Sequence, residues 1–114
     1  MMTGRRHDTA IKRIWNGWTT KENADNYENI LRKEVLAGIE AKKIRGYKKI
    51  EVLKIELEDE VEFVTIMTFE SLQNVIDFQG VEYKRGYIPD VAQKVLKRWD
   101  QESRHYDLIE KRKY

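Results

Sequence analysis

The chain has few residues that could carry out chemistry. It contains two histidines, His7 and His105, and no cysteine, which excludes disulfides, thiolate metal sites and cysteine nucleophiles. His105 and Asp107 share one face of an expected strand, where they could act as a base or supply two metal ligands. No third ligand stands at motif spacing, and the sequence has no phosphate-binding loop, dinucleotide fingerprint, nucleophile elbow or H-E-x-x-H. We therefore expect no metal site.

A second group of candidates combines one amide with aromatic rings. Asn16 could donate a hydrogen bond to a substrate carbonyl or to a bound oxygen species, and Trp18 could form a wall on the same strand face. Phe78, Tyr83 and Tyr87 could line the opening of such a pocket from a helix and the loop after it. An apolar aromatic pocket with one hydrogen-bonding group would suit a phenolic or enolic substrate that loses a proton.

These residues also have structural readings. Tryptophans on a strand buried on both faces pack in cores and interfaces, so Trp18 could be a core or dimer contact. Asn16 lies among apolar neighbours and needs a hydrogen-bond partner, which packing or a cap could provide as well as a ligand. Phe78 suits a core position, and we expect Trp99 to pack on a helix.

The composition places the chain among ordinary globular domains. Of its 114 residues 37% are charged, the net charge is only +2, and acids and bases interleave. Nucleic-acid-binding domains carry a larger, clustered positive excess, so we expect no nucleic acid as partner. No apolar run approaches the roughly 20 residues of a membrane span. We expect a flexible lead-in over residues 1–9, one domain over 10–114 and a cytoplasmic location.

The elements that must position these residues follow from periodicity. Residues 10–19 read as a strand with large side chains on both faces. Thr19 and Glu22 spell a capping box, T-x-x-E, that begins an amphipathic helix ending near Ile44, just before Gly46. The remaining expected elements are strands 47–57 and 61–69, a helix between Ser71 and Gly80, a loop over 81–88, a short helix from Pro89 or Asp90 that includes Trp99, and a last strand over 104–111.

The order βαββα(α)β predicts an α+β fold of the ferredoxin-like kind, with a four-stranded antiparallel sheet. Helices can cover only one face of that sheet, yet the first three strands carry apolar residues on both faces. A second copy is the simplest cover for the other face, because homo-oligomers are usually two-fold symmetric. We therefore expect a homodimer formed through the sheet face.

The sequence resembles the antibiotic biosynthesis monooxygenase-like family, whose members are dimeric α/β barrels built from ferredoxin-like protomers. The resemblance covers roughly residues 10–110. It is carried by the stretches IWNGWTTKENADNYENILRKEVLAGI, RGYKKIEVLK, EVEFVTIMTFESL and HYDLI. It implies a cofactor-independent monooxygenase acting on a small aromatic or polyketide-like substrate. The residues named above for that chemistry are then the candidate site, with Asn16 as the catalytic residue and Trp18, Phe78, Tyr83 and Tyr87 around the substrate. The alternative is a non-catalytic dimer, stress-related or binding a small hydrophobic molecule.

Two other functions share this topology. The haem-degrading branch of the family has an Asn on the first strand, a Trp on the second helix and then a His. Asn16 stands at the first position, but Phe78 takes the second and Tyr87 or Ile88 the third, so no axial ligand is present and we expect no cofactor. In RNA-recognition domains an aromatic motif lies on the third strand. Here the similar residues 45–47 precede the second strand and lack the motif's continuation.

Overall fold

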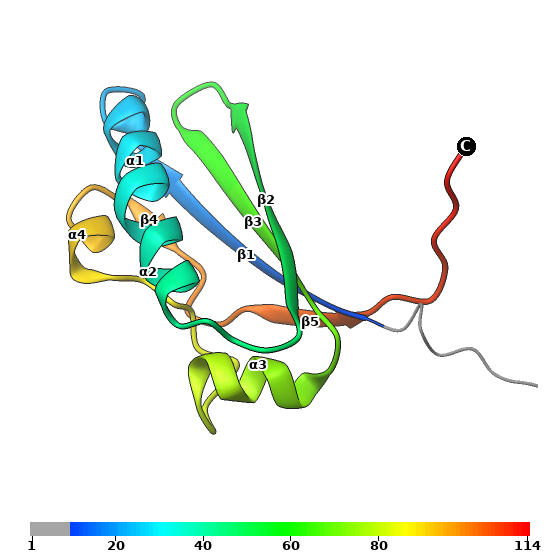
Figure 1. Ribbon diagram of the computed structural model, residues 1–114. Coiled ribbons are helices and arrows are strands. Elements are labelled where there is room, and N and C mark those ends of the chain that lie inside the picture. Colours follow the sequence, from blue (N-terminus) through cyan, green and yellow to red (C-terminus); the bar gives the residue numbers. More distant parts are fainter. Residues whose placement is uncertain (1–9) are drawn as a thin grey trace, which may run out of the picture.

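The computed structural model describes residues 10–114 as one antiparallel sheet with all of its helices on one side (Figure 1). Apolar β-branched and aromatic residues dominate the long strands, which suits a sheet with one face in the core. The strands are β1 (Ile11–Thr19), β2 (Tyr47–Glu56), β3 (Val61–Phe69), β4 (Arg98–Trp99) and β5 (Arg104–Asp107). The helices are α1 (Ala24–Ile30), the π-helical segment η1 (Leu31–Val35), α2 (Leu36–Ala41), α3 (Leu72–Gln79) and α4 (Asp90–Gln93).

The sheet order β2-β3-β1-β4 confirms the ferredoxin-like fold. β1 lies at the centre, paired with β3 along its whole length. The position beyond β1 is shared by two short strands, since β5 pairs with the start of β1 and β4 with its end. The expected single fourth strand over 104–111 is therefore shorter, and a second short strand joins it at this edge.

Trp99 was expected on a helix, and this expectation is wrong. The helix α4 ends at Gln93, and the chain then crosses to the open edge of β1. The amide of Lys97 donates to the carbonyl of Trp18 at 2.7 Å, and the amide of Asp100 donates to the carbonyl of Asn16 at 2.9 Å. The segment joins the sheet because it supplies hydrogen-bond partners to backbone groups at that edge of β1 that would otherwise be unpaired.

The first helix differs at both ends from its expected bounds. Thr19 is the last residue of β1 and fully buried, so the capping box it was expected to form with Glu22 is absent. The hydroxyl of Thr20 instead accepts from the amide of Asn23, one residue before α1 begins. The helix ends at Ala41 rather than near Ile44. The helix α3 agrees with expectation, because the hydroxyl of Ser71 accepts from an amide of its first turn and Gly80 ends it.

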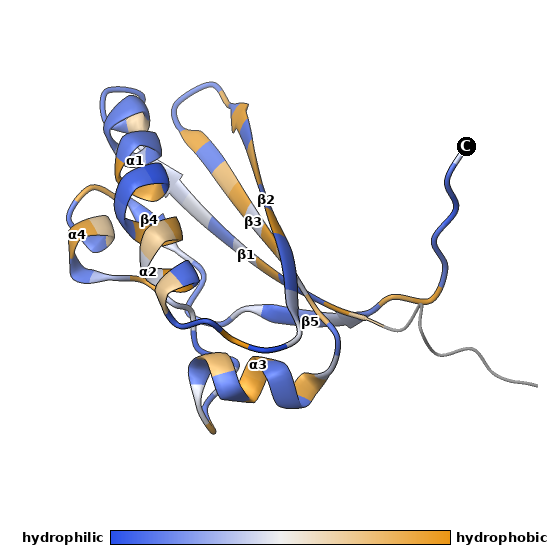
Figure 2. Cartoon of the chain, in the orientation of Figure 1, coloured by the Kyte–Doolittle hydropathy of each residue, from blue (hydrophilic) through white to orange (hydrophobic). Residues whose placement is uncertain are grey.

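The core lies between the sheet and the helices. Alternate residues of β1, from Arg13 to Thr19, are buried under the helices, while their neighbours point to the other face. Phe63, Phe69 and Val75 are almost fully buried in this core. Figure 2 shows hydrophobic residues along β2 and β3 as well as on the inner sides of the helices. No helix within residues 10–114 is long and apolar enough to cross a membrane.

Candidate ligand cavity

A partly open cavity of about 30 Å³ lies between the helix layer and the sheet. Its wall is mostly apolar and comes from β1, β2, β3, the long first helix, the segment around α4 and Ser103. Five polar or hydroxyl-bearing residues also line it, namely Arg13, Tyr27, Thr65, Tyr87 and Ser103. A space of this size holds a water molecule or a group such as a carboxylate, but not an aromatic ring. A larger ligand therefore requires part of the wall to move.

The helix wall of the cavity contains a π-helical segment. Leu31 and Val35, at the two ends of η1, both line the cavity. Single π-helical turns inside α-helices are uncommon and are frequent at functional sites. One turn later, Gly38 lets the ring of Tyr87 come close, because a Cβ at residue 38 would lie 2.9 Å from the Tyr87 hydroxyl. The first helix is thus shaped around the cavity.

Among the described residues, Arg13 is the only charged residue that lines the cavity, and it is 3% exposed. Its Nη1 donates to the carbonyl of Tyr83 at 2.6 Å, and its Nη2 donates to the carbonyl of Arg85 at 2.8 Å. Nη1 also lies 2.9 Å from Nε2 of His105. Within residues 10–114 no carboxylate lies within ion-pair distance of Arg13. Burial lowers the pKa of Arg13 to about 10, and the group is still charged at neutral pH.

The imidazole of His105 is held neutral at this site. Burial, the charge of Arg13 and the charge of Lys84 together lower its pKa to about 4. Nε2 then accepts the hydrogen bond from Arg13, which leaves the remaining proton on Nδ1. The lone pair that would make His105 a base is therefore already used.

A second cation stands beside Arg13. The Lys42 ammonium lies 4.4 Å from the centre of the Phe78 ring and 4.7 Å from that of Tyr87. The Arg13 guanidinium lies 5.5 Å from the centre of the same Phe78 ring. Desolvation first, and then repulsion by Arg13, lowers the pKa of Lys42. Two positive charges thus share one aromatic ring with no acid paired to either within the described residues.

The hydroxyl of Ser103 is the other unusual polar group of the cavity. Ser103 is 4% exposed, and its Oγ has no hydrogen-bond partner within the described part of the chain. A buried hydroxyl without a partner costs free energy and calls for an explanation. Ser103 is one of the residues that line the cavity.

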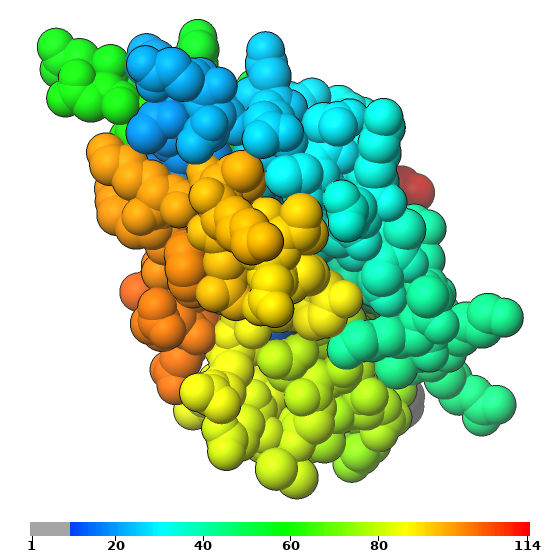
Figure 3. Space-filling view, turned by 90° about the vertical axis from the view of Figure 1, so that its left-hand side faces the viewer, coloured from blue at the N-terminus to red at the C-terminus, as the bar shows by residue number. Residues whose placement is uncertain are grey.

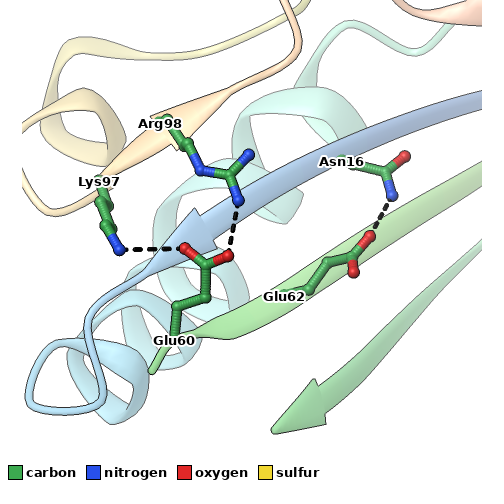
Figure 4. A network of polar contacts seen from close by, with 5 residues as sticks. All are labelled: Asn16, Glu60, Glu62, Lys97 and Arg98. Atoms are coloured by element: carbon green, nitrogen blue, oxygen red, sulfur yellow. Dashed lines mark hydrogen bonds and ion pairs between the residues drawn. The ribbon is translucent and has the colours of Figure 1, made fainter. Parts of the chain in front are cut away.

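The structure divides the five residues expected at the site between the two faces of the sheet. Asn16 and Trp18 point to the face without helices, because they alternate with Arg13 and Trp15 along β1. The amide nitrogen of Asn16 donates to Glu62 on β3 at 2.5 Å (Figure 4). The guanidinium of Arg98 lies 4.0 Å from the centre of the Trp18 ring. Neither residue reaches the cavity.

The Asn16–Glu62 contact lies beside a small ion-pair network at the same end of the sheet. Glu60 binds both Lys97 at 3.1 Å and Arg98 at 2.6 Å (Figure 4). These contacts tie β4 and the segment before it to the start of β3. They give Arg98 and Asn16 structural partners on the open face.

Of the other three expected residues, Phe78 and Tyr87 come together and Tyr83 lies outside the cavity. Phe78 and Tyr87 pack with ring centres 5.4 Å apart, and Tyr87 lines the cavity. Tyr83 lies against His105 with ring centres 5.2 Å apart and lines a groove outside the cavity. The His105–Asp107 pair acquires no third ligand, since no group of three acidic or histidine side chains within residues 10–114 could hold a metal ion.

Sequence reasoning missed Arg13 and Ser103 as site residues. Arg13 had a visible signal, because it is the one charged residue in the row of β1 that also contains Trp15 and Gly17. A charge in a buried row needs partners or a ligand. Ser103 carried no such signal, since its burial depends on the way the segment between β4 and β5 crosses the edge of β1.

Comparison with known proteins supports the fold. No family model matches the chain, and no curated protein matches it by sequence. A Bacillus cereus structure described as a candidate antibiotic biosynthesis monooxygenase superposes with a TM-score of 0.59 at 13% identity, over 93% of this chain and 98% of that one. A conserved protein from Methanosarcina mazei Go1 gives 0.56 at 12% identity, over 93% and 97%. The chain therefore has the ferredoxin-like fold found in antibiotic biosynthesis monooxygenase-like proteins.

Proposed function

We propose that the chain is a cofactor-independent monooxygenase that oxidises a small aromatic or polyketide-like substrate in the cavity beneath its helices. The observation that carries this proposal is the cavity itself, a mostly apolar space under the helices, walled by a π-helical turn and aromatic rings. The fold shared with the Bacillus cereus structure supports the same class of reaction.

The proposed oxidation needs little from the protein other than such a cavity. A ring CH₂ next to a carbonyl or phenol is oxidised to C=O while O₂ gives the second product, H₂O, so atoms and electrons balance without another reductant. The substrate must first be ionised, and its electron-rich carbon then reacts with O₂. Apolar walls exclude water from this reaction, and a fixed positive charge stabilises the ionised substrate.

Entry of a ring requires the wall to open, and the segment around α4 is the part best suited to move. α4 has four residues, and the chain before it from 80 to 89 is mostly irregular. Segments with so few regular hydrogen bonds open at low cost compared with the whole domain. Tyr87 and Ala92 lie on this segment and line the cavity.

Oxygen uptake with anthrone-type and quinol-type substrates tests the proposal. With the anthrone-type substrates we expect one O₂ consumed per ring CH₂ oxidised to a carbonyl, with one labelled oxygen atom from ¹⁸O₂ in the product. Tyr87→Ala should abolish turnover, while Tyr83→Ala, from the same loop but outside the cavity, should retain it. Asn16 stays a sequence prediction, and Asn16→Ala tests it in parallel. No uptake with the whole panel, or equal loss in the Tyr83 and Tyr87 variants, would contradict the proposal.

We propose a second copy of the chain as the partner of the open sheet face. That face carries apolar side chains, among them Leu53 and Ile55 on the edge strand β2, which are 52% and 53% exposed. Lys49 at one end of this face lies beside Glu51, and Glu62 at the opposite end lies near Arg98, so each end carries both signs of charge. A two-fold axis through the middle would cover the apolar side chains of one copy with those of the other. The cytoplasmic location stays a prediction.

A further inference from the structure

The cavity has a positive charge but no base. Among the described residues, Arg13 is the only charged one in its wall, and the other polar side-chain groups there are hydroxyls and the indole N–H of Trp15, which donates to the carbonyl of Asp100. Burial raises the pKa of Tyr27, so this phenol is neutral. The nearest imidazole, His105, already accepts from Arg13 and does not line the cavity. No group in the wall could take a proton from a neutral substrate.

Within residues 10–114, the positive charge is also left without an anion. Arg13 is buried and bound only by neutral acceptors, and Lys42 adds a second cation over the same Phe78 ring. Burying a charge without a counter-ion is costly, and mutual repulsion adds to the cost. An anion placed in the cavity would offset both, and the unpartnered hydroxyl of Ser103 would gain an acceptor there.

The surface offers a route to this charge. Figure 3 shows a hollow between α3, the segment that follows it and the end of α2, with a small area in the blue of β1 visible at the bottom. Lys42, at the end of α2, contacts the rings of Phe78 and Tyr87, which belong to the other two borders. A cation at such an entrance favours the approach of anions.

We propose that the cavity binds its ligand as an oxyanion that is already ionised in solution, held by Arg13 and the Ser103 hydroxyl. The ligand class is then an aromatic molecule with an acidic phenol or enol, or with a carboxylate, rather than a neutral aromatic. This inference rests on the cavity being the ligand site, and it names the substrate class of the proposed oxidation.

Two matched pairs of probes test it without any turnover. The phenol pair is 4-nitrophenol and its methyl ether, 4-nitroanisole, and the carboxylate pair is benzoate and benzamide. We expect at least one anion to bind roughly tenfold or more tightly than its neutral partner, the gain typical of a hydrogen bond to a charged group. The pair that shows the difference identifies the oxyanion. Bound 4-nitrophenol should also ionise at lower pH than free probe, which its phenolate absorption reports.

Variants of the chain decide whether Arg13 is responsible. Arg13→Gln should remove the preference for the anion. Arg85→Gln should keep it, because that side chain is exposed and only the backbone carbonyl of Arg85 contacts Arg13. Should Arg13→Gln fail to fold, Ser103→Ala decides, with binding of the anion weakened several-fold and binding of the neutral partner unchanged.

Three results would overturn the inference. These are equal binding of anion and neutral partner in both pairs, an unchanged preference in folded Arg13→Gln, and an unchanged preference in Ser103→Ala when Arg13→Gln does not fold. The probes contain no oxidisable ring CH₂, so their binding is independent of oxygen chemistry. If the anions bind but no substrate causes oxygen uptake, the proposed monooxygenase function is refuted and the proposed anion binding is not. If oxygen uptake occurs only with neutral substrates, the proposal that the ligand binds as an oxyanion is refuted.

Discussion

Replacing His105 by Gln should change the acid stability of the protein more than its stability at neutral pH. At pH 7 the imidazole is neutral and accepts a hydrogen bond from Arg13 through Nε2. A glutamine carbonyl can accept the same bond, so we expect the free energies of unfolding of the two proteins at pH 7 to differ by less than about 1 kcal/mol.

The difference appears as the pH falls. The pKa of His105 is about 4 in the folded protein, against 6.5 for an unperturbed imidazole. Well above pH 6.5 neither the folded nor the unfolded chain carries the proton on His105. Between pH 6.5 and about 4 the unfolded chain binds it and the folded chain does not, so the wild-type protein loses stability over this window.

The size of the loss follows from the same values. The gap from 6.5 to about 4, at about 1.4 kcal/mol per pH unit, gives an upper limit of about 3 kcal/mol. His105 is only partly buried, and water screens part of the repulsion by Arg13 and Lys84, so we expect roughly 1–2 kcal/mol. Urea unfolding at pH 7, 6, 5 and 4 measures this as the difference between the wild type and His105→Gln, in which the carboxylate contributions cancel. The reasoning would be refuted if the free energies of unfolding of the wild type and His105→Gln changed in parallel with pH. It would also be refuted if NMR showed that His105 in the folded protein titrates near pH 6.5.

Three further changes test other parts of the structure. Arg13→Met should lower the free energy of unfolding by about 2–4 kcal/mol in urea, since two buried carbonyls lose their donors, and a loss below 1 kcal/mol would contradict that role. Gly17→Ala should lower the free energy of unfolding by about 1–3 kcal/mol in the same assay, because the new Cβ would lie 2.6 Å from the Trp15 ring. An unchanged free energy of unfolding would show that the Trp15 ring can move aside without cost. Ile66→Lys, on the open sheet face, should halve the mass found by light scattering, while Leu72→Lys on α3 should leave a dimer; a wild-type monomer would refute the dimer.

The long elements could be predicted from the sequence because each has a strong local signal. Alternation and β-branched residues predicted β1 and β3 to within one residue, and Ser71 and Gly80 marked both ends of α3. The short segment after Gln93 gave no such signal. Its path depends on the free edge of β1, and a contact distant in sequence decided between helix and strand for Trp99.

The candidate site was predictable in part. The pattern of β1 correctly separates Arg13 and Trp15 from Asn16 and Trp18, but it does not say which row faces the helices when both rows carry large residues. The face of β1 that packs under the helices is set by its partner strand β3. There Phe63 and Phe69 are buried under the helices, and the register of the two strands places them beside the Arg13 row. Aromatic residues after α3 were expected at the opening, and Tyr87 lies in the cavity wall.

Methyl NMR with a bound probe tests the central claim most directly. With 4-nitrophenolate added, the methyl signals of Leu31 and Val35, in the cavity wall, should shift and show contacts to the probe ring. Those of Leu53 and Ile55, on the open face of β2, should stay in place. Contacts to Leu53 and Ile55 with no change at Leu31 and Val35 would place the ligand on the open sheet face and contradict the account.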